Sequence, residues 1–249
     1  MMIRLSVNVN KVATLRNARG GRLPRVLDAV DACLGAGAAG ITVHPRADRR
    51  HITPEDVRDI ARALENRRPT IEYNIEGDPR PDLLELVLDV GPDQCTLVPV
   101  VPGEITSGAG WTEGRGTERL PEAIQALKSR GIRVSLFVDP GPDAIRFAAS
   151  IGADRVELYT EPFARAFERG AHEARRSFAV YAEVATLASS LGLGVNAGHD
   201  LDLHNLMLFR DLPRLDEVSI GHALMSRALF VGLGSVVREY LAVLAGAGA

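Results

Sequence analysis

The stretch LPEAIQALKSRGIRVSLFVDP, residues 120–140, holds the unit from which the whole chain is built. An amphipathic segment, residues 120–130, ends before Gly131, and a β-type run, residues 133–139, follows at once. Glycine readily takes the left-handed conformation that ends a helix, so this order predicts a helix, a glycine cap and a buried strand. Eight such β-type runs occur, at residues 5–10, 41–44, 70–74, 96–99, 133–139, 155–160, 194–197 and 217–220.

The order of these runs predicts an α/β fold, a single (β/α)8 TIM barrel with extra helices that spans residues 1–249 as one domain. Strands alternate with helices, and no Pro/Gly/Ser-rich linker divides the chain. The alternative is an open doubly wound sheet, but its G-x-G-x-x-G turn after the first strand is missing. Residues 161–191 are too many for one connection between a strand and the next helix, so we expect an extra helix there. Residues 222–244 predict the eighth barrel helix.

Composition excludes several partners. The 249 residues carry a formal charge of −3, which gives no global basic field for nucleic acid. No apolar run reaches the roughly 18 residues of a membrane helix, and no leader pattern precedes the first strand. Cys33 and Cys95 both lie in apolar stretches, which favours two buried thiols over a disulfide. We therefore expect a cytoplasmic protein with no nucleic-acid or membrane partner.

Polar residues interrupt strands that should be aliphatic on both faces. In residues 5–10 the odd positions are apolar, whereas Ser6, Asn8 and Asn10 share the other face. The outward face of a barrel strand packs against helices, so the polar face points inward, towards the end where barrel enzymes work. The alternative for each buried carboxylate is a salt bridge inside the barrel. The same parity turns His44, Glu72 and Glu157 inward.

Two basic loops predict a phosphorylated ligand. Residues 11–22 carry four cations and no acid, and residues 44–51 carry a net +2 with a histidine at each end. Guanidinium groups bind phosphate in a bidentate manner, so we expect Arg19 and Arg46 to meet anions. The other arginines of these loops are expected either to be solvated or to pair with nearby acids; they are Arg16, Arg22, Arg49 and Arg50.

Strands seven and eight each run into a Gly-His turn, Gly198-His199 and Gly221-His222. Barrel enzymes often bind phosphate at this place, on free N–H groups at a helix start. His199 could instead transfer protons. The spacing of histidines and acids matches no metal motif, so we expect no metal site and no cofactor.

Long motifs in a fixed order carry a resemblance over nearly the whole chain. The sequence resembles the pyridoxine 5'-phosphate synthase family through VNVNKVATLRNARGG (7–21), GITVHPRADRRHIT (40–53), LVPVVPGEIT (97–106), VSLFVDP (134–140), LGLGVNAGHDL and SIGHA. The resemblance implies a cofactor-independent barrel that assembles as a homo-octamer, a tetramer of dimers. It also implies ring closure between 3-amino-2-oxopropyl phosphate and 1-deoxy-D-xylulose 5-phosphate, giving pyridoxine 5'-phosphate, phosphate and water.

The resemblance also assigns residues. His44, Glu72 and His199 match proton-transfer positions, and Glu157 matches a carboxylate that stabilises a charged transition state. Substrate-binding positions fall on Asn8, Arg19, Arg46, His51, Thr106, Gly221 and His222.

Four departures from the family's usual sequence fall in or beside the implied site. Asn10 and Lys11 stand where the family usually has Asp-His at the sugar phosphate, and Asp200 replaces a usual glycine; Thr160-Glu161 departs from Thr-Gly. We expect Asn10, Lys11 and Asp200 to meet substrate, with Lys11 able to contact phosphate. Two alternatives stay open: a divergent barrel enzyme acting on another phosphorylated carbonyl compound, and a noncatalytic phosphometabolite-binding protein.

Overall fold

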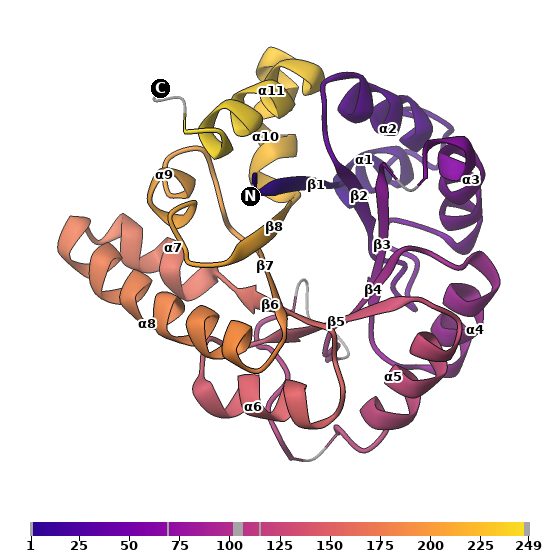
Figure 1. Cartoon of the computed structure of the whole chain (residues 1–249). Coiled ribbons are helices and arrows are strands. Elements are labelled where there is room, and N and C mark those ends of the chain that lie inside the picture. The colour runs from indigo at the N-terminus through magenta and orange to yellow at the C-terminus, as the bar shows by residue number, and fades with distance from the viewer. Residues whose placement is uncertain (1, 69, 102–106, 115, 247–249) are drawn as a thin grey trace.

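The computed structural model describes residues 2–68, 70–101, 107–114 and 116–246. Its eight strands are all parallel and close into one barrel in sequence order, with helices around the outside (Figure 1). The predicted TIM barrel is confirmed. The strands are β1 Arg4–Asn8, β2 Gly40–Val43, β3 Glu72–Gly77, β4 Gln94–Leu97, β5 Arg133–Val138, β6 Arg155–Tyr159, β7 Gly194–Gly198 and β8 Leu215–Ile220.

The helices lie between the strands in the expected order. They are α1 Asn10–Asn17, α2 Val26–Gly35, α3 Pro54–Leu64, the 3-10 turn η1 Glu65–Arg67, α4 Pro81–Val90, α5 Leu120–Ser129, α6 Pro142–Ser150, α7 Glu161–Glu168, α8 Ala171–Ser190, α9 Leu206–Phe209, α10 His222–Val231 and α11 Leu233–Leu244. The expected extra helix is α7, which packs against α8. No helix among the described residues is long and apolar enough to cross a membrane.

Local chemistry sets most boundaries. Gly131 takes φ +75° after α5, as predicted, whereas Gly35 is still helical and Gly37 takes the left-handed turn, φ +105°. Thr53 caps α3, because its hydroxyl accepts from the Asp56 N–H while the Asp56 carboxylate accepts from the Thr53 N–H. The expected eighth helix is broken into α10 and α11 at Gly232, φ +86°. The first residue of α10, His222, lies at the barrel mouth.

The limits of all eight strands differ from the prediction by one to three residues at one end or both, and two of these differences bear on the site. Strand β1 ends at Asn8, and Asn10 begins α1, so Asn10 faces the barrel mouth from a helix start. Strand β3 begins at Glu72 and runs on to Gly77, several residues beyond the expected end at residue 74. The outward side chains Tyr73 and Ile75 are both fully buried under the helices. Burial of this outer face is typical of a strand in a parallel barrel, so β3 continues past residue 74.

The barrel interior is polar along its height. In its middle layer the hydroxyls of Ser6 and Thr42 are 2.7 Å apart, and the Thr96 hydroxyl donates to the side-chain Oδ1 of Asn74 at 3.1 Å. These short side chains satisfy one another without charge, so the ionisable groups collect in separate layers at the two ends.

Candidate active site

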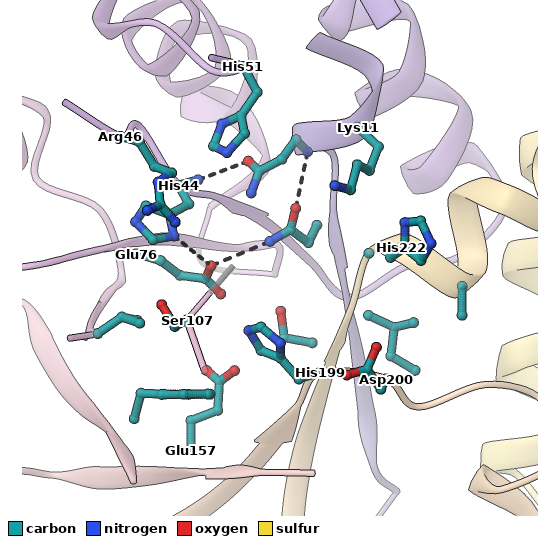
Figure 2. A pocket seen from close by; sticks show the side chains of 18 of the residues that line it. Lys11, His44, Arg46, His51, Glu76, Ser107, Glu157, His199, Asp200 and His222 are labelled. Atoms are coloured by element: carbon teal, nitrogen blue, oxygen red, sulfur yellow. Dashed lines mark hydrogen bonds and ion pairs between the residues drawn. The ribbon is translucent and has the colours of Figure 1, made fainter. Parts of the chain in front are cut away.

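A cavity of about 440 Å³ opens at the C-terminal ends of the strands (Figure 2). It brings together most of the residues that the sequence singles out. Those lining it are Asn8, Asn10, Lys11, His44, Arg46, His51, Glu157, His199, Asp200, Gly221 and His222, together with Arg50, Glu76, Ser107 and Phe137.

Two predicted residues among the described ones do not line the cavity, and a further predicted residue lies outside the described ranges. Arg19 is exposed in the turn after α1. Thr106 lies outside the described residues, although its neighbour Ser107 lines the cavity and donates to the Pro99 carbonyl at 2.9 Å. The other described residue that does not line the cavity is Glu72.

Glu72 lies at the opposite end of the barrel from the cavity, so its predicted place in the site is wrong. It is the first residue of β3, only 4% exposed, and its Oε2 accepts from Arg133 Nη2 at 2.5 Å. Arg4 Nη1 approaches the same oxygen at 3.4 Å. Glu72 is thus a member of an ion-pair layer at the N-terminal ends of the strands, the structural alternative stated for it above.

The residue that sequence reasoning missed is Glu76. It shares the inward face of β3 with Glu72 but stands four residues further along, immediately before Gly77. The register of β2 and β3 explains its position. Gly40 pairs with Glu72 and Val43 with Ile75, so the next residues along the chain, His44 and Glu76, lie side by side. The sequence did contain a signal for this: the turn Gly77-Asp-Pro shows where β3 ends, and Glu76 precedes it directly. Glu76 therefore stands at the end of β3 as His44 stands at the end of β2.

Glu76 is contacted by residues at the C-terminal ends of β1 and β2. Asn8 Nδ2 donates to its Oε2 at 3.4 Å, and His44 Nδ1 lies 3.8 Å from the same oxygen (Figure 2). Burial raises the pKa of Glu76 to about 8. Burial, followed by charge interactions with His51 and Arg46, lowers the pKa of His44 well below its usual range. Near pH 7 the contact therefore joins a neutral imidazole to a carboxylic acid, and both groups can accept or donate a proton.

Glu157 forms the second buried carboxyl of the cavity. Burial, followed by the charge of Glu76, raises its pKa well above the usual range, and its Oε2 has no hydrogen-bond partner among the described residues. Two carboxyls that oppose each other's ionisation share protons, so at least one of the pair stays neutral near pH 7. A Cβ on Gly198 would come within 2.3 Å of Glu157 Oε1, so a larger residue at this position would displace the carboxyl.

Asn10 organises the mouth of the cavity. Its Oδ1 accepts from the His44 backbone N–H at 2.9 Å, and its own N–H donates to Asn8 Oδ1 at 3.1 Å (Figure 2). These bonds run from His44 through Asn10 and Asn8 to Glu76. Asn10 therefore holds the His44 backbone in this structure, whichever substrate atoms its amide nitrogen meets.

Positive charge surrounds the open side of the cavity. Lys11 and the buried Arg46 line it, and His222 begins α10, whose first N–H groups have no helical partner. Such a helix start attracts anions. Arg16 instead pairs with Asp56 at 2.5 Å, and Arg50 Nε donates to Asp48 at 2.7 Å, the alternative expected for both. His51, whose pKa burial and Arg46 lower to about 4, is uncharged at neutral pH.

No group of three His, Cys, Asp or Glu side chains within the described ranges is arranged to hold a metal ion. The two cysteines, Cys33 and Cys95, are buried free thiols.

Comparison with known proteins places this barrel and its cavity in one family. The family model "Pyridoxal phosphate biosynthesis protein PdxJ" matches residues 5–246. Pyridoxine 5'-phosphate synthase of Christiangramia forsetii is 50% identical over 244 residues, 98% of this chain and 100% of its own length. That of Bacteroides thetaiotaomicron is 50% identical over 240 residues, 96% of this chain and 98% of its own.

Solved structures share the fold at low identity. 3-Hexulose-6-phosphate synthase from Salmonella typhimurium superposes with a TM-score of 0.67 at 15% identity, covering 99% of this chain and 100% of that one. Phosphoribosylanthranilate isomerase from Thermotoga maritima gives 0.61 at 14% identity, covering 98% and 100%. These likenesses concern the barrel alone, whereas the family match and the 50% relatives concern the sequence that builds the cavity. The chain therefore belongs to the PdxJ family of pyridoxine 5'-phosphate synthases, ring-closing enzymes of vitamin B6 biosynthesis.

Proposed function

We propose that this cavity condenses 3-amino-2-oxopropyl phosphate with 1-deoxy-D-xylulose 5-phosphate by general acid/base catalysis, forming pyridoxine 5'-phosphate, phosphate and water. One observation carries the proposal: Glu76, His44, Glu157 and His199 line a single cavity ringed by Lys11, Arg46 and the start of α10. Proton-transfer groups and anion-binding groups thus face the same space, as two phosphorylated carbonyl compounds require.

The proposed proton transfers follow from the protonation states. Joining the amine to the ketone as an imine requires the carbinol oxygen to be protonated before it leaves as water. Ring closure then requires a proton to be taken from a carbon beside the imine. Glu76, with a pKa of about 8, supplies both forms near neutral pH, and the neutral His44 beside it accepts the exchanged proton. We assign this exchange to Glu76 and His44.

Glu157 and His199 serve the other side of the cavity. A cation that develops on the imine nitrogen favours the ionised form of Glu157, whose pKa burial otherwise raises, and the carboxylate then stabilises that cation because its unpartnered oxygen is buried where charge interactions are strong. His199 is partly exposed at the cavity wall, and burial lowers its pKa, so it too is neutral and can relay a proton to or from the departing water.

The anion-binding groups divide between two ends of the cavity. Lys11 and His222 come from the starts of α1 and α10, which contact each other, while Arg46 and His51 come from the loop after β2. We assign one phosphate to each end, with Asn8, Asn10 and Gly221 contacting the substrates between them. Contacts from Arg19, Thr106 and Asp200 stay predictions of the resemblance.

The test incubates the purified chain with both substrates and follows pyridoxine 5'-phosphate by chromatography and phosphate by a colorimetric assay. Product from the wild type but not from Glu76→Gln supports the proposal, and a Glu76→Gln variant that still binds the aminoketone phosphate shows that the loss is chemical. A wild type that makes no product while binding either substrate refutes it.

A second reading is favoured by Lys11 and Asp200, which both line the cavity and add charge where the family usually has His and Gly. A divergent enzyme would use the same acid/base groups on another phosphorylated carbonyl compound. Turnover of a different sugar phosphate with 3-amino-2-oxopropyl phosphate, at a higher kcat/KM than 1-deoxy-D-xylulose 5-phosphate, would establish that reading.

The proposal extends to a cytoplasmic homo-octamer built from dimers. Consecutive apolar side chains at the end of α10, Leu229, Phe230 and Val231, are 72%, 87% and 43% exposed, a surface that a second copy would cover. Light scattering after size-exclusion chromatography measures the assembly. A Phe230→Asp variant is expected to shift it towards smaller species, and a wild-type monomer would refute the octamer.

A further inference from the structure

Three aromatic rings meet at the cavity wall opposite His44. The centroids of Phe137 and His199 are 5.3 Å apart, those of Tyr159 and His199 are 5.4 Å apart, and those of Phe137 and Tyr159 are 5.4 Å apart. Tyr159 meets the imidazole nearly edge-on, with 82° between the planes. Phe137 is 1% and Tyr159 7% exposed. With Val98, these two rings form an apolar cluster separate from the main core of the barrel.

The backbone beneath the imidazole is strained. His199 has φ +76° and Asp200 φ +54°, two consecutive non-glycine residues in the left-handed region. Such a conformation is unfavourable for a residue with a side chain and persists only when its surroundings hold it. The deeply buried Thr160 hydroxyl donates to the Gly198 carbonyl at 2.7 Å and also to that of His199, and Asn205 Nδ2 donates to the Asp200 carbonyl at 2.9 Å.

The imidazole itself has no hydrogen-bonding side chain within the part of the chain that the structure describes. Catalytic histidines are usually oriented by a carboxylate or carbonyl that accepts from the second ring nitrogen. Here His199 lines the cavity (Figure 2), and among the described residues its ring contacts and the held turn fix the orientation of the imidazole.

We infer that Phe137 and Tyr159 are positioning residues that hold the His199 imidazole aimed into the cavity, with Thr160 fixing the turn that carries it. The inference deepens the proposed function, because it rests on His199 exchanging protons there. The rings also exclude water from one side of the imidazole. Three charged groups influence the protonation of His199. Asp200 and Glu161 favour the protonated imidazole, and Lys11 disfavours it.

The test compares Phe137→Leu and Tyr159→Leu, which remove a ring, with Tyr159→Phe, which keeps it. Phe167→Leu is the matched control, because it removes an aromatic side chain that packs on Phe163, away from the cavity. For each variant we would measure kcat, KM for both substrates, the melting temperature and the titration of the His199 imidazole by NMR. His199→Gln identifies the resonance.

Loss of either ring is expected to lower kcat about 10- to 100-fold, since misplacing a catalytic group by about 1 Å has effects of that size. KM should change less than about threefold, and the imidazole should titrate closer to its ordinary value of about 6.5 as water reaches it. Tyr159→Phe should restore kcat and the titration. Ring-removing variants that lower the melting temperature as Phe167→Leu does, but keep wild-type kcat and titration, would overturn the inference.

A second pair of variants tests the inference even if the ring-removing variants fail to fold. Thr160→Val keeps the shape but loses the hydroxyl that holds the turn, and Thr160→Ser keeps the hydroxyl. Valine should lower kcat and shift the titration while serine restores both; equal behaviour of the two would also count against the inference. The NMR readout needs no turnover, so an inactive wild type refutes the proposed function and leaves the orientation of His199 to be judged from the titration and the ring contacts.

Discussion

Two glutamates on one face of β3 should behave in opposite ways when each is changed to glutamine. Glu72→Gln is expected to cost stability and spare catalysis, because Glu72 is paired with Arg133 and Arg4 at the end of the barrel away from the cavity. Glu76→Gln is expected to spare stability and abolish catalysis, because Glu76 lines the cavity and exchanges protons there. The two glutamates lie on the same face of the same strand, four residues apart, so each variant serves as the control for the other.

The size of each effect follows from the contacts. Removing one partner of a buried ion pair costs about 3–5 kcal/mol. Here Arg133 and Arg4 are 31% and 38% exposed, so water still solvates the cations, and the glutamine carbonyl still accepts a hydrogen bond. We therefore expect Glu72→Gln to cost about 1–3 kcal/mol, a fall in melting temperature of about 2–10 °C for a chain of this size.

Glu76→Gln should change the free energy of unfolding by less than about 1 kcal/mol, because it replaces a carboxyl that is largely neutral in the fold. Its kcat should fall about 10²- to 10⁴-fold, the range for losing one general acid/base group. Urea unfolding measures the first quantity and chromatography of pyridoxine 5'-phosphate the second. A folded Glu72→Gln with a hundredfold loss of kcat, or a Glu76→Gln with wild-type kcat, would refute the assignment.

The remaining predictions concern pH and the second substrate. The rate should rise with pH up to about 8, because Glu76 accepts a proton only when ionised and its pKa is about 8; a plateau from pH 6 upwards in a kcat/KM profile would contradict this. Burial, then the charge of Glu72, raises the pKa of Glu217 to about 8, so its contribution to stability is complete below about pH 4.3, its unfolded value, and is lost as pH rises through 8. Glu217→Gln should therefore exceed the wild type in stability at pH 9 by on the order of 1–3 kcal/mol and match it near pH 5, measured by urea unfolding; parallel pH dependences would exclude this. Lys11→His should keep or improve turnover of 1-deoxy-D-xylulose 5-phosphate, and a large loss in kcat/KM would show that Lys11 has a role of its own.

Periodicity in the sequence was enough to predict the barrel. Helix, glycine and strand recur with little irregularity, which predicts a parallel α/β sheet, and the absence of a G-x-G-x-x-G turn after the first strand favoured the closed barrel over an open doubly wound sheet. The broken eighth helix was missed because apolar residues continue across Gly232, and a single glycine is tolerated inside many helices.

Alternation predicted which face of a strand points inward but not how high a residue sits. Glu72 and Glu76 share one face, yet four residues of strand place them about 13 Å apart. The height depends on the pairing of Gly40 with Glu72, a contact between segments far apart in sequence. The partners of the arginines could not be predicted for the same reason. Arg16 of α1 pairs with Asp56 of α3, a contact between segments far apart in sequence that no pattern within residues 11–22 predicts.

The pairing of the first strand with the last has a consequence for synthesis of the chain on the ribosome. Arg4 pairs with Glu217, and a Cβ on Gly221 would lie 3.1 Å from Asn8, so the earliest and latest parts of the barrel share one wall of the cavity. While the chain emerges, β1 must wait with an unpaired edge until residues 215–220 follow some two hundred positions later. Nascent chains that stop before β8 would thus hold an open sheet, prone to pair with a neighbour's edge and without a complete site.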